Sequence, residues 1–153
     1  MTSLKETMQA DLTDAIRARD ELTVATLRMA LAGITNEEVS GKSARVLTDA
    51  EVVTVLTREA KKRREASSAF AGGGRPELAA REDAELEVLA RYLPTPLTED
   101  EVAGLVSEAV ARAAADDVTG MPAMGRVMKE LTGTTAGRFD GGRLAAMVRT
   151  ALR

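Results

Sequence analysis

The positively charged residues of the last third of the chain are the side chains whose type and spacing most suggest a chemical task. After Gly120 the chain carries six arginines and lysines against two acidic residues, a balance of +4 that leaves −7 for residues 1–120. An excess of one sign in one segment indicates an anionic partner, and a solvated helix face is the alternative. The candidate phosphate contacts are Arg126, Lys129, Arg138 and Arg143, with Gly137 and Gly141 letting a backbone approach.

A second basic stretch lies near the middle of the chain, where five of the seven residues from 58 to 64 are arginine or lysine. Helical rotation places Arg58, Lys61 and Lys62 on one side and turns Arg63 onto the apolar side. The run could follow the phosphates of a nucleic acid. No aromatic side chains interleave with it, which argues against base stacking. A solvated helix face is the alternative here too.

Residues for catalysis are missing from the sequence. The chain has no histidine and no cysteine, which removes the commonest general base, the serine–histidine nucleophile pair and most transition-metal sites. The glycines at 72–74 lack the Gly-Lys-Ser/Thr end of a phosphate-binding loop, so a helix-ending turn is favoured. We therefore expect no catalytic residue and no cofactor.

One pair of carboxylates resembles part of a di-metal site. Glu82 and Glu85 share a helix face, but such bundle sites also need Glu-x-x-His partners, and histidine is absent. Salt bridges from these carboxylates to Arg63 or Arg75 are the favoured interpretation. We expect no metal ligands.

The composition predicts an all-α protein. Aromatic residues make up only 2% of the chain, and alanine, leucine, arginine and glutamate, which are strong helix formers, are abundant. The net charge of −3 argues against a general nucleic-acid binder. No run of about 18 apolar residues exists and the N-terminus lacks an apolar signal core, so we expect no membrane partner and a cytoplasmic protein.

The stretch from Leu93 to Thr98 divides the chain, because two prolines separated by one residue stop a helix. We expect an N-terminal four-helix domain over residues 1–93, a proline joint at 94–96 and a C-terminal three-helix bundle over 97–153. Thr98 and Glu101 form the pattern of a capping box, as do Thr48 and Glu51. The expected helices cover residues 3–19, 21–39, 48 to the glycines at 72–74, 76–92, 99–115, 123–131 and 140–152.

Two features of the tail have competing interpretations. Four methionines gather there, at positions 121, 124, 128 and 147. They either fill a small core, which we favour, or dock a partner helix. Gly125 would weaken its helix by about 1 kcal/mol relative to alanine, so we expect it to permit the close approach of another helix.

Many short motifs, taken in order, resemble one family. They are Asp11-Leu12 with Ala15, Thr26 to Met29, Asn36-Glu37, Leu47 to Asp49, Lys62 to Ala66, Arg75, Leu78, Glu82, Glu85, Tyr92 to Pro94, Met124 to Met128, Gly137 to Gly141, Val148 and Leu152. Together they resemble the GatB/YqeY-like family, of the small stand-alone YqeY type. Ala123 and Gly142 depart from the family, which often has an acidic residue and a lysine there.

The resemblance implies an all-helical fold whose tail is similar to the C-terminal domain of the B subunit of the glutamine-dependent tRNA amidotransferase. In that enzyme the tail helps to hold tRNA, and family members are often catalogued as carbon–nitrogen ligases with glutamine as amido-N-donor. The residues here do not support independent catalysis of that reaction.

The leading hypothesis is therefore a tRNA-binding or tRNA-related accessory protein. Its partner would be tRNA or another structured RNA, with a protein of the translation machinery as a further expected partner. A helical protein–protein interaction module without nucleic-acid binding is the alternative, and a ligase is a third. The RNA hypothesis needs open guanidinium groups near the last two helices, rather than groups locked in internal carboxylate pairs.

Overall fold

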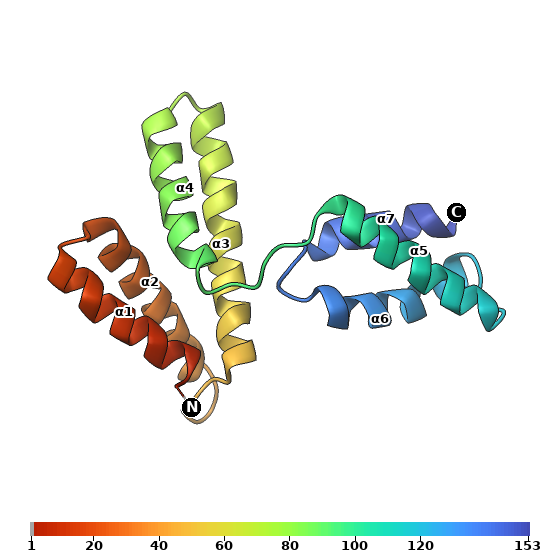
Figure 1. Cartoon of the computed structure of the whole chain (residues 1–153), viewed down its shortest axis with the longest axis horizontal. Coiled ribbons are helices and arrows are strands. Elements are labelled where there is room, and N and C mark those ends of the chain that lie inside the picture. The colour runs from red at the N-terminus through yellow and green to blue at the C-terminus, as the bar shows by residue number, and fades with distance from the viewer. Residues whose placement is uncertain (1) are drawn as a thin grey trace. The chain divides into compact units, whose positions relative to one another are not determined.

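The structure is a computed structural model that describes residues 2–153, and this part of the chain is all-helical, as predicted (Figure 1). It divides after Leu93 into two compact units, here called the N-terminal unit and the tail. The helices are α1 (Leu4–Ala18), α2 (Glu21–Glu38), α3 (Asp49–Gly72), α4 (Pro76–Ala90), α5 (Glu99–Ala115), the short 3-10 helix η1 (Met121–Ala123), α6 (Met124–Thr135) and α7 (Gly141–Leu152).

The first residues of the helices follow from capping side chains. Ser3 and Thr48 each form a complete capping box, with Glu6 and Glu51 as the reciprocal partners. Thr98 accepts a hydrogen bond from the backbone N–H of Glu101 at 3.1 Å. No return bond from the Glu101 side chain forms, so the capping box predicted there is only half present.

The N-terminal unit is built on α3 and α4, which form a long helical hairpin, with α1 and α2 packed beside its lower half (Figure 1). Gly74, at φ +74°, makes the turn between α3 and α4, and Pro76 starts α4. The apolar faces of all four helices meet in one core, whose largest fully buried side chains are Met8, Leu27, Ile34, Leu56 and Leu89.

The tail packs the apolar stripes of α5, α6 and α7 around a second core. Its fully buried members include Val102, Val127, Leu131, Leu144 and Val148. Helix α6 continues four residues beyond the predicted end at Leu131. Threonine and glycine are weak helix formers, but Thr135 is 3% exposed and its hydroxyl donates to the carbonyl of Leu131 at 2.9 Å. Tertiary packing thus extends the helix.

The tail methionines behave mainly as core residues. Met124, Met128 and Met147 are partly buried against the tail core, whereas Met121 is half exposed. The interpretation of Gly125 was wrong, because no atom outside its chain neighbours and the nearby backbone of its own helix lies within 4 Å of the point where its side chain would begin. That position faces open space and does not seat another helix.

No helix in the described part of the chain is long and apolar enough to cross a membrane.

Candidate functional site

Three of the four predicted phosphate contacts in the tail already have partners inside the tail. Arg126 pairs with Asp116 at the end of α5. Arg143 makes a two-pronged contact with Glu99, from Nε to Oε1 at 2.6 Å and from Nη2 to Oε2 at 3.1 Å. Arg138 donates from Nε to the carbonyl oxygen of Thr95 at 3.0 Å. The guanidinium groups of these three arginines therefore already have hydrogen-bond or ion-pair partners.

These pairs arise because the tail balances its own charge. Between residues 94 and 120, Arg112 stands against six acidic residues. Counting the whole tail, seven arginines and lysines against eight acidic residues give −1. Helix α5 supplies carboxylates to both basic helices, and its Arg112 in turn pairs with Glu130 of α6. The positive excess after Gly120 is thus offset within the same unit.

Exposed cations without a carboxylate partner nevertheless remain on α6, on α7 and at the C-cap of α7. Lys129, Arg149 and Arg153 are exposed, and within the described residues none has a carboxylate oxygen within 4 Å. The existing pairs are also at the surface, with side chains 43% and 64% exposed for Arg126 and Asp116 and 52% and 60% for Arg143 and Glu99. Exposed ion pairs contribute little to stability, so an incoming anion can replace the carboxylate cheaply.

The electrostatics of the Arg143–Glu99 pair keep both partners charged. The hydrogen bond from Arg143 lowers the pKa of Glu99 below its ordinary value, and the same bond raises the pKa of Arg143. Any phosphate that binds Arg143 must therefore compete with a fully ionised carboxylate at neutral pH.

The two predicted glycines have different surroundings. Gly137 has φ +74° and makes the turn after α6, so glycine is required there by the backbone conformation. Gly141, at the first position of α7, is exposed, and no atom lies within 4 Å of the point where a side chain would begin. Gly141 therefore leaves its backbone open to a ligand.

The second predicted patch, on α3, is less neutralised. Arg58 lies 3.7 Å from Glu37, and Lys62 lies 3.4 Å from Glu59. Lys61 and the neighbouring Arg64 are exposed and have no carboxylate oxygen within 4 Å among the described residues. This exposed strip of α3 is therefore a cationic surface in its own right.

Arg63 points inward, as helical rotation predicted, and lies in a buried charge cluster. Its Nη1 donates to Oε2 of Glu59 at 2.9 Å, and its Nε lies 3.5 Å from Oε2 of Glu85. Arg81 approaches the other oxygen of Glu85 at 3.4 Å. The pairing of Glu85 with Arg63 confirms the salt-bridge interpretation for that carboxylate, and it joins α3 to α4. For Glu82 the interpretation was wrong, because within the described residues no arginine or lysine nitrogen lies within 4 Å of its carboxylate.

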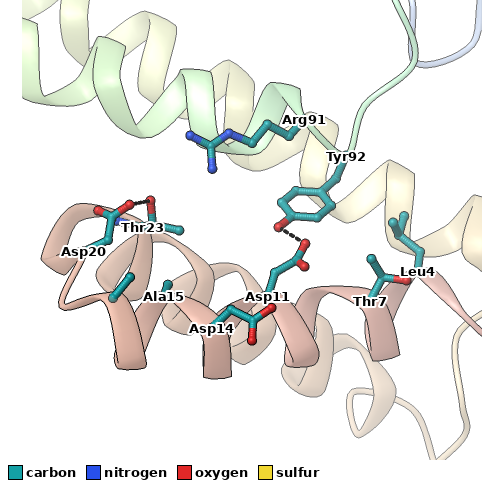
Figure 2. A pocket seen from close by; sticks show the side chains of 10 residues that line it. Leu4, Thr7, Asp11, Asp14, Ala15, Asp20, Thr23, Arg91 and Tyr92 are labelled. Carbon is teal, nitrogen blue, oxygen red and sulfur yellow. Dashed lines mark hydrogen bonds between the residues drawn. The ribbon is translucent and has the colours of Figure 1, made fainter.

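An open cavity of about 600 Å³ lies between α1, the start of α2 and the residues after α4 (Figure 2). Figure 2 shows the Tyr92 hydroxyl pointing at Asp11, to which it donates at 2.7 Å. Burial first, and this hydrogen bond second, raise the pKa of Tyr92 well above its ordinary value of 10. The phenol therefore remains a donor at physiological pH.

The charged groups in the remaining walls of this cavity are two aspartates and one arginine. Asp14 and Asp20 line it together with Arg91. Hydrogen bonds from the side chain and backbone of Thr23 lower the pKa of Asp20, which caps α2. Three carboxylates against one guanidinium do not suit a phosphate. The described residues contain no group of three or more acidic side chains that could hold a metal ion.

Sequence reasoning did not find this cavity. Asp11 and Tyr92 are 81 residues apart, and no local pattern links them. Both residues occur among the motifs that carried the family resemblance, but nothing in their spacing indicated that they touch.

Comparison with known proteins identifies relatives along most of the chain. A protein of Schizosaccharomyces pombe described as uncharacterized is 31% identical over 93 residues, which cover 60% of this chain and 73% of the relative. The protein named "Altered inheritance of mitochondria protein 41, mitochondrial" of Pyrenophora tritici-repentis is 29% identical over 129 residues, 82% of this chain and 70% of the relative.

The family model of the Yqey-like proteins matches residues 5–152, which is nearly the whole of the two helical units described above. The chain therefore belongs to the YqeY-like family.

Proposed function

We propose that this protein binds RNA through its phosphate backbone and acts as a tRNA-related accessory protein. The observation that carries the proposal is the set of exposed cations on α6, on α7 and at the C-cap of α7. There Lys129, Arg149 and Arg153 have no carboxylate partner among the described residues, and Arg126 and Arg143 have partners at the surface. A phosphate can take over these arginines from Asp116 and Glu99 without disturbing a core.

The side chains favour contacts to phosphates over contacts to bases. The chain has one tyrosine, two phenylalanines and no tryptophan, and Phe139, the aromatic residue of the tail, packs against the tail core. Without exposed aromatic side chains for stacking, binding depends on charge, so it falls steeply with salt and tolerates different base sequences. The choice of tRNA rests on the family resemblance.

The proposed role is binding and not catalysis. Histidine and cysteine are absent, and the cavity beside Tyr92 presents carboxylates, which repel the phosphates of RNA. We expect that the purified protein alone does not amidate mischarged tRNA in the presence of glutamine and ATP.

Charge reversal tests the proposed surface. Arg126→Glu with Lys129→Glu should weaken the retention of tRNA on a native gel at least about tenfold. The affinity should also fall less steeply with salt, because fewer phosphates are neutralised. The control is Arg17→Glu with Arg28→Glu. This pair lies in the N-terminal unit and changes the net charge of the chain by the same amount. Equal weakening by both pairs would mean that only net charge matters.

Removal of the competing carboxylates should change the affinity for tRNA in the opposite direction. Asp116→Asn and Glu99→Gln free Arg126 and Arg143, so each should tighten tRNA binding several-fold at low salt. If neither change tightens binding while the charge reversal weakens it, then Lys129 and its neighbours carry the contacts and the paired arginines do not.

A protein–protein module is the second candidate, and one observation favours it. A depression of about 380 Å³ between the end of α1 and the start of α2 is lined by three apolar residues, of which Ile16 is 47% exposed, and three charged ones. They are Ile16, Val24 and Ala25, with Arg19, Glu21 and Arg28. An exposed apolar side chain of this size in a depression is typical of protein contacts. Recovery of a stoichiometric protein after nuclease treatment, with no tRNA retention, would support this candidate over RNA binding.

We further propose the cytoplasm as the place of action, while the printed name of one relative refers to mitochondria. Fractionation of cells that express the tagged protein, with compartment markers, distinguishes the two.

A further inference from the structure

A buried arginine of the N-terminal unit has one side of its guanidinium group incompletely bonded. The Arg63 side chain is 6% exposed. Its Nη1 is satisfied twice, by the carbonyl oxygen of Glu59 at 3.1 Å and by Oε2 of the same residue at 2.9 Å. Its buried Nε has no hydrogen-bond partner, because Glu85 approaches only to 3.5 Å. A buried donor without an acceptor is costly.

The next donor on that side, Nη2, is met by sulfur. Nη2 of Arg63 lies 2.9 Å from Sδ of Met29 on α2. A thioether is a weak hydrogen-bond acceptor. Nε–H and Nη2–H of a guanidinium group belong to one planar fork, which suits a strong oxygen acceptor lying in the same plane. Here a sulfur atom accepts a hydrogen bond from Nη2, and Nε has no hydrogen-bond partner.

Met29 is also accessible. Although its sulfur touches a buried cation, the residue is 46% exposed. Met121 of the tail is similarly exposed, at 50%, and Met8 is fully buried. The described residues thus include one exposed methionine whose sulfur has a guanidinium partner and one exposed methionine whose sulfur has none, which makes Met121 the natural comparison.

We propose that Met29 is a reversible oxidation site at which the sulfoxide oxygen becomes the acceptor for the Nη2–Nε fork of Arg63. A hydroperoxide is the oxidant. A sulfur lone pair attacks one peroxide oxygen, an S–O bond forms and the O–O bond breaks, and the proton of the transferred hydroxyl goes to the leaving oxygen. Sulfur loses two electrons and the hydroperoxide is reduced to an alcohol or to water.

Oxidation at this position strengthens the packing of α2 on α3. At most sites a sulfoxide places a polar group among apolar neighbours and loosens the structure. At Met29 the new oxygen faces a guanidinium group whose Nε lacks an acceptor, so a charge-assisted hydrogen bond replaces a weak one. A methionine sulfoxide reductase reverses the change.

Hydrogen exchange on the full-length protein, before and after mild hydrogen peroxide, tests the proposal. Peptide mass spectrometry should find sulfoxide at Met29, and amide exchange in α3 around residues 60–67 should slow by about tenfold, as expected of a hydrogen bond to a charged group. Met29→Leu should abolish the slowing, and Met121→Leu should leave it intact.

The nuclear magnetic resonance signal of the Arg63 Nε–H gives an independent measurement. Oxidation should move this signal and slow its exchange with water, and reduction by the reductase should restore both. The proposal is overturned if Met29 stays unmodified while Met121 is oxidised, or if exchange in α3 accelerates or does not change once Met29 is the sulfoxide.

Discussion

The two units of this protein treat charge in opposite ways. Within the described residues, the N-terminal unit buries two carboxylates and a guanidinium group, and the tail buries no charged side chain at all. The buried polar residue of the tail is Thr135, whose hydroxyl is satisfied by the preceding turn of α6. The buried polar residues of the N-terminal unit are Thr23, Thr26, Glu38, Arg63 and Glu85.

The buried charges of the N-terminal unit hold parts of the fold in place. Glu38 accepts from Nζ of Lys5 at 2.6 Å and from the backbone N–H of Leu47 at 3.2 Å. These bonds tie the end of α2 to α1 and fix the loop before α3. They also lower the pKa of Glu38, with the Lys5 contact as the largest cause. Loss of Lys5 would therefore leave the Glu38 carboxylate, whose side chain is 10% exposed, with little water to hydrate it.

The charges of the tail, in contrast, can change partners. Its ion pairs are formed by side chains that are between 37% and 64% exposed, so either member can be hydrated at once if the other leaves. An anion that binds Arg126 or Arg143 replaces one surface carboxylate by another acceptor. The difference between the units therefore assigns structural roles to the buried charges and leaves ligand exchange to the exposed ones.

Arg63→Ala should produce the largest effect and is the sharpest test of this difference. It leaves the buried Glu85 with only the exposed Arg81 as a partner, and removal of one member of a buried ion pair costs about 3–5 kcal/mol. We expect urea unfolding, followed by hydrogen exchange in each unit, to show this loss in the N-terminal unit and none in the tail.

The control for that variant replaces both partners. Arg63→Met with Glu85→Leu removes the charges and keeps the volume, which is often nearly neutral in stability. Arg143→Ala removes one member of an exposed ion pair of the tail and should cost little stability. If Arg63→Ala lowered the free energy of unfolding as little as Arg143→Ala does, the distinction between buried and exposed charges would be contradicted.

A smaller effect is expected from glycines of the tail. Because the side-chain position of Gly125 is open, Gly125→Ala should stabilise the tail by up to about 1 kcal/mol through helix propensity. Gly137→Ala is the matched contrast. Its φ of +74° lies in the left-handed region, so alanine there should destabilise the tail by about 1–2 kcal/mol.

Thermal unfolding monitored by circular dichroism, with hydrogen exchange to assign the change to the tail, measures both glycine variants. Destabilisation by Gly125→Ala would show that α6 needs close backbone approach at this position after all.

Features set by local sequence could be predicted well. The apolar periodicity and the capping residues indicated the all-helical class, and α5 was predicted at about 99–115, where it lies. The capping box at Thr48 and the inward rotation of Arg63 are also local properties, because each depends on residues within one or two turns. Such features need no knowledge of which helices become neighbours.

Features set by tertiary neighbours could not be predicted. The charge excess after Gly120 was counted along the chain, but Asp116 and Glu99 neutralise it across space. The extension of α6 depends on a core that accepts Thr135, and the contact of Asp11 with Tyr92 depends on how α1 lies against the end of α4. The assignment of the cations to RNA stays a prediction.

A smaller difference between the two units is expected in how their stability depends on pH in acid. The pKa values of Asp20, Glu38 and Glu51 in the N-terminal unit are lowered from their ordinary values of 3.8 and 4.5, chiefly by hydrogen bonds from Thr23, Lys5 and Arg45 respectively. In the tail the pKa of Glu99 is lowered by Arg143. A carboxyl with a lowered pKa stabilises the fold above its unfolded pKa, and this contribution disappears as the pH falls through the folded pKa.

Below about pH 5, therefore, the N-terminal unit should lose stability more steeply than the tail, because it has three such carboxyls against one. The raised pKa of Arg143 adds no acid dependence, since its contribution is complete at low pH and is lost only in strong base. Urea midpoints of each unit at pH 7, 5, 4 and 3, read by residue-resolved hydrogen exchange or nuclear magnetic resonance, measure the two slopes. Glu99→Gln should flatten the slope of the tail and leave that of the N-terminal unit unchanged; a slope in the tail that survives this change would place its acid sensitivity in a group other than the Glu99–Arg143 pair.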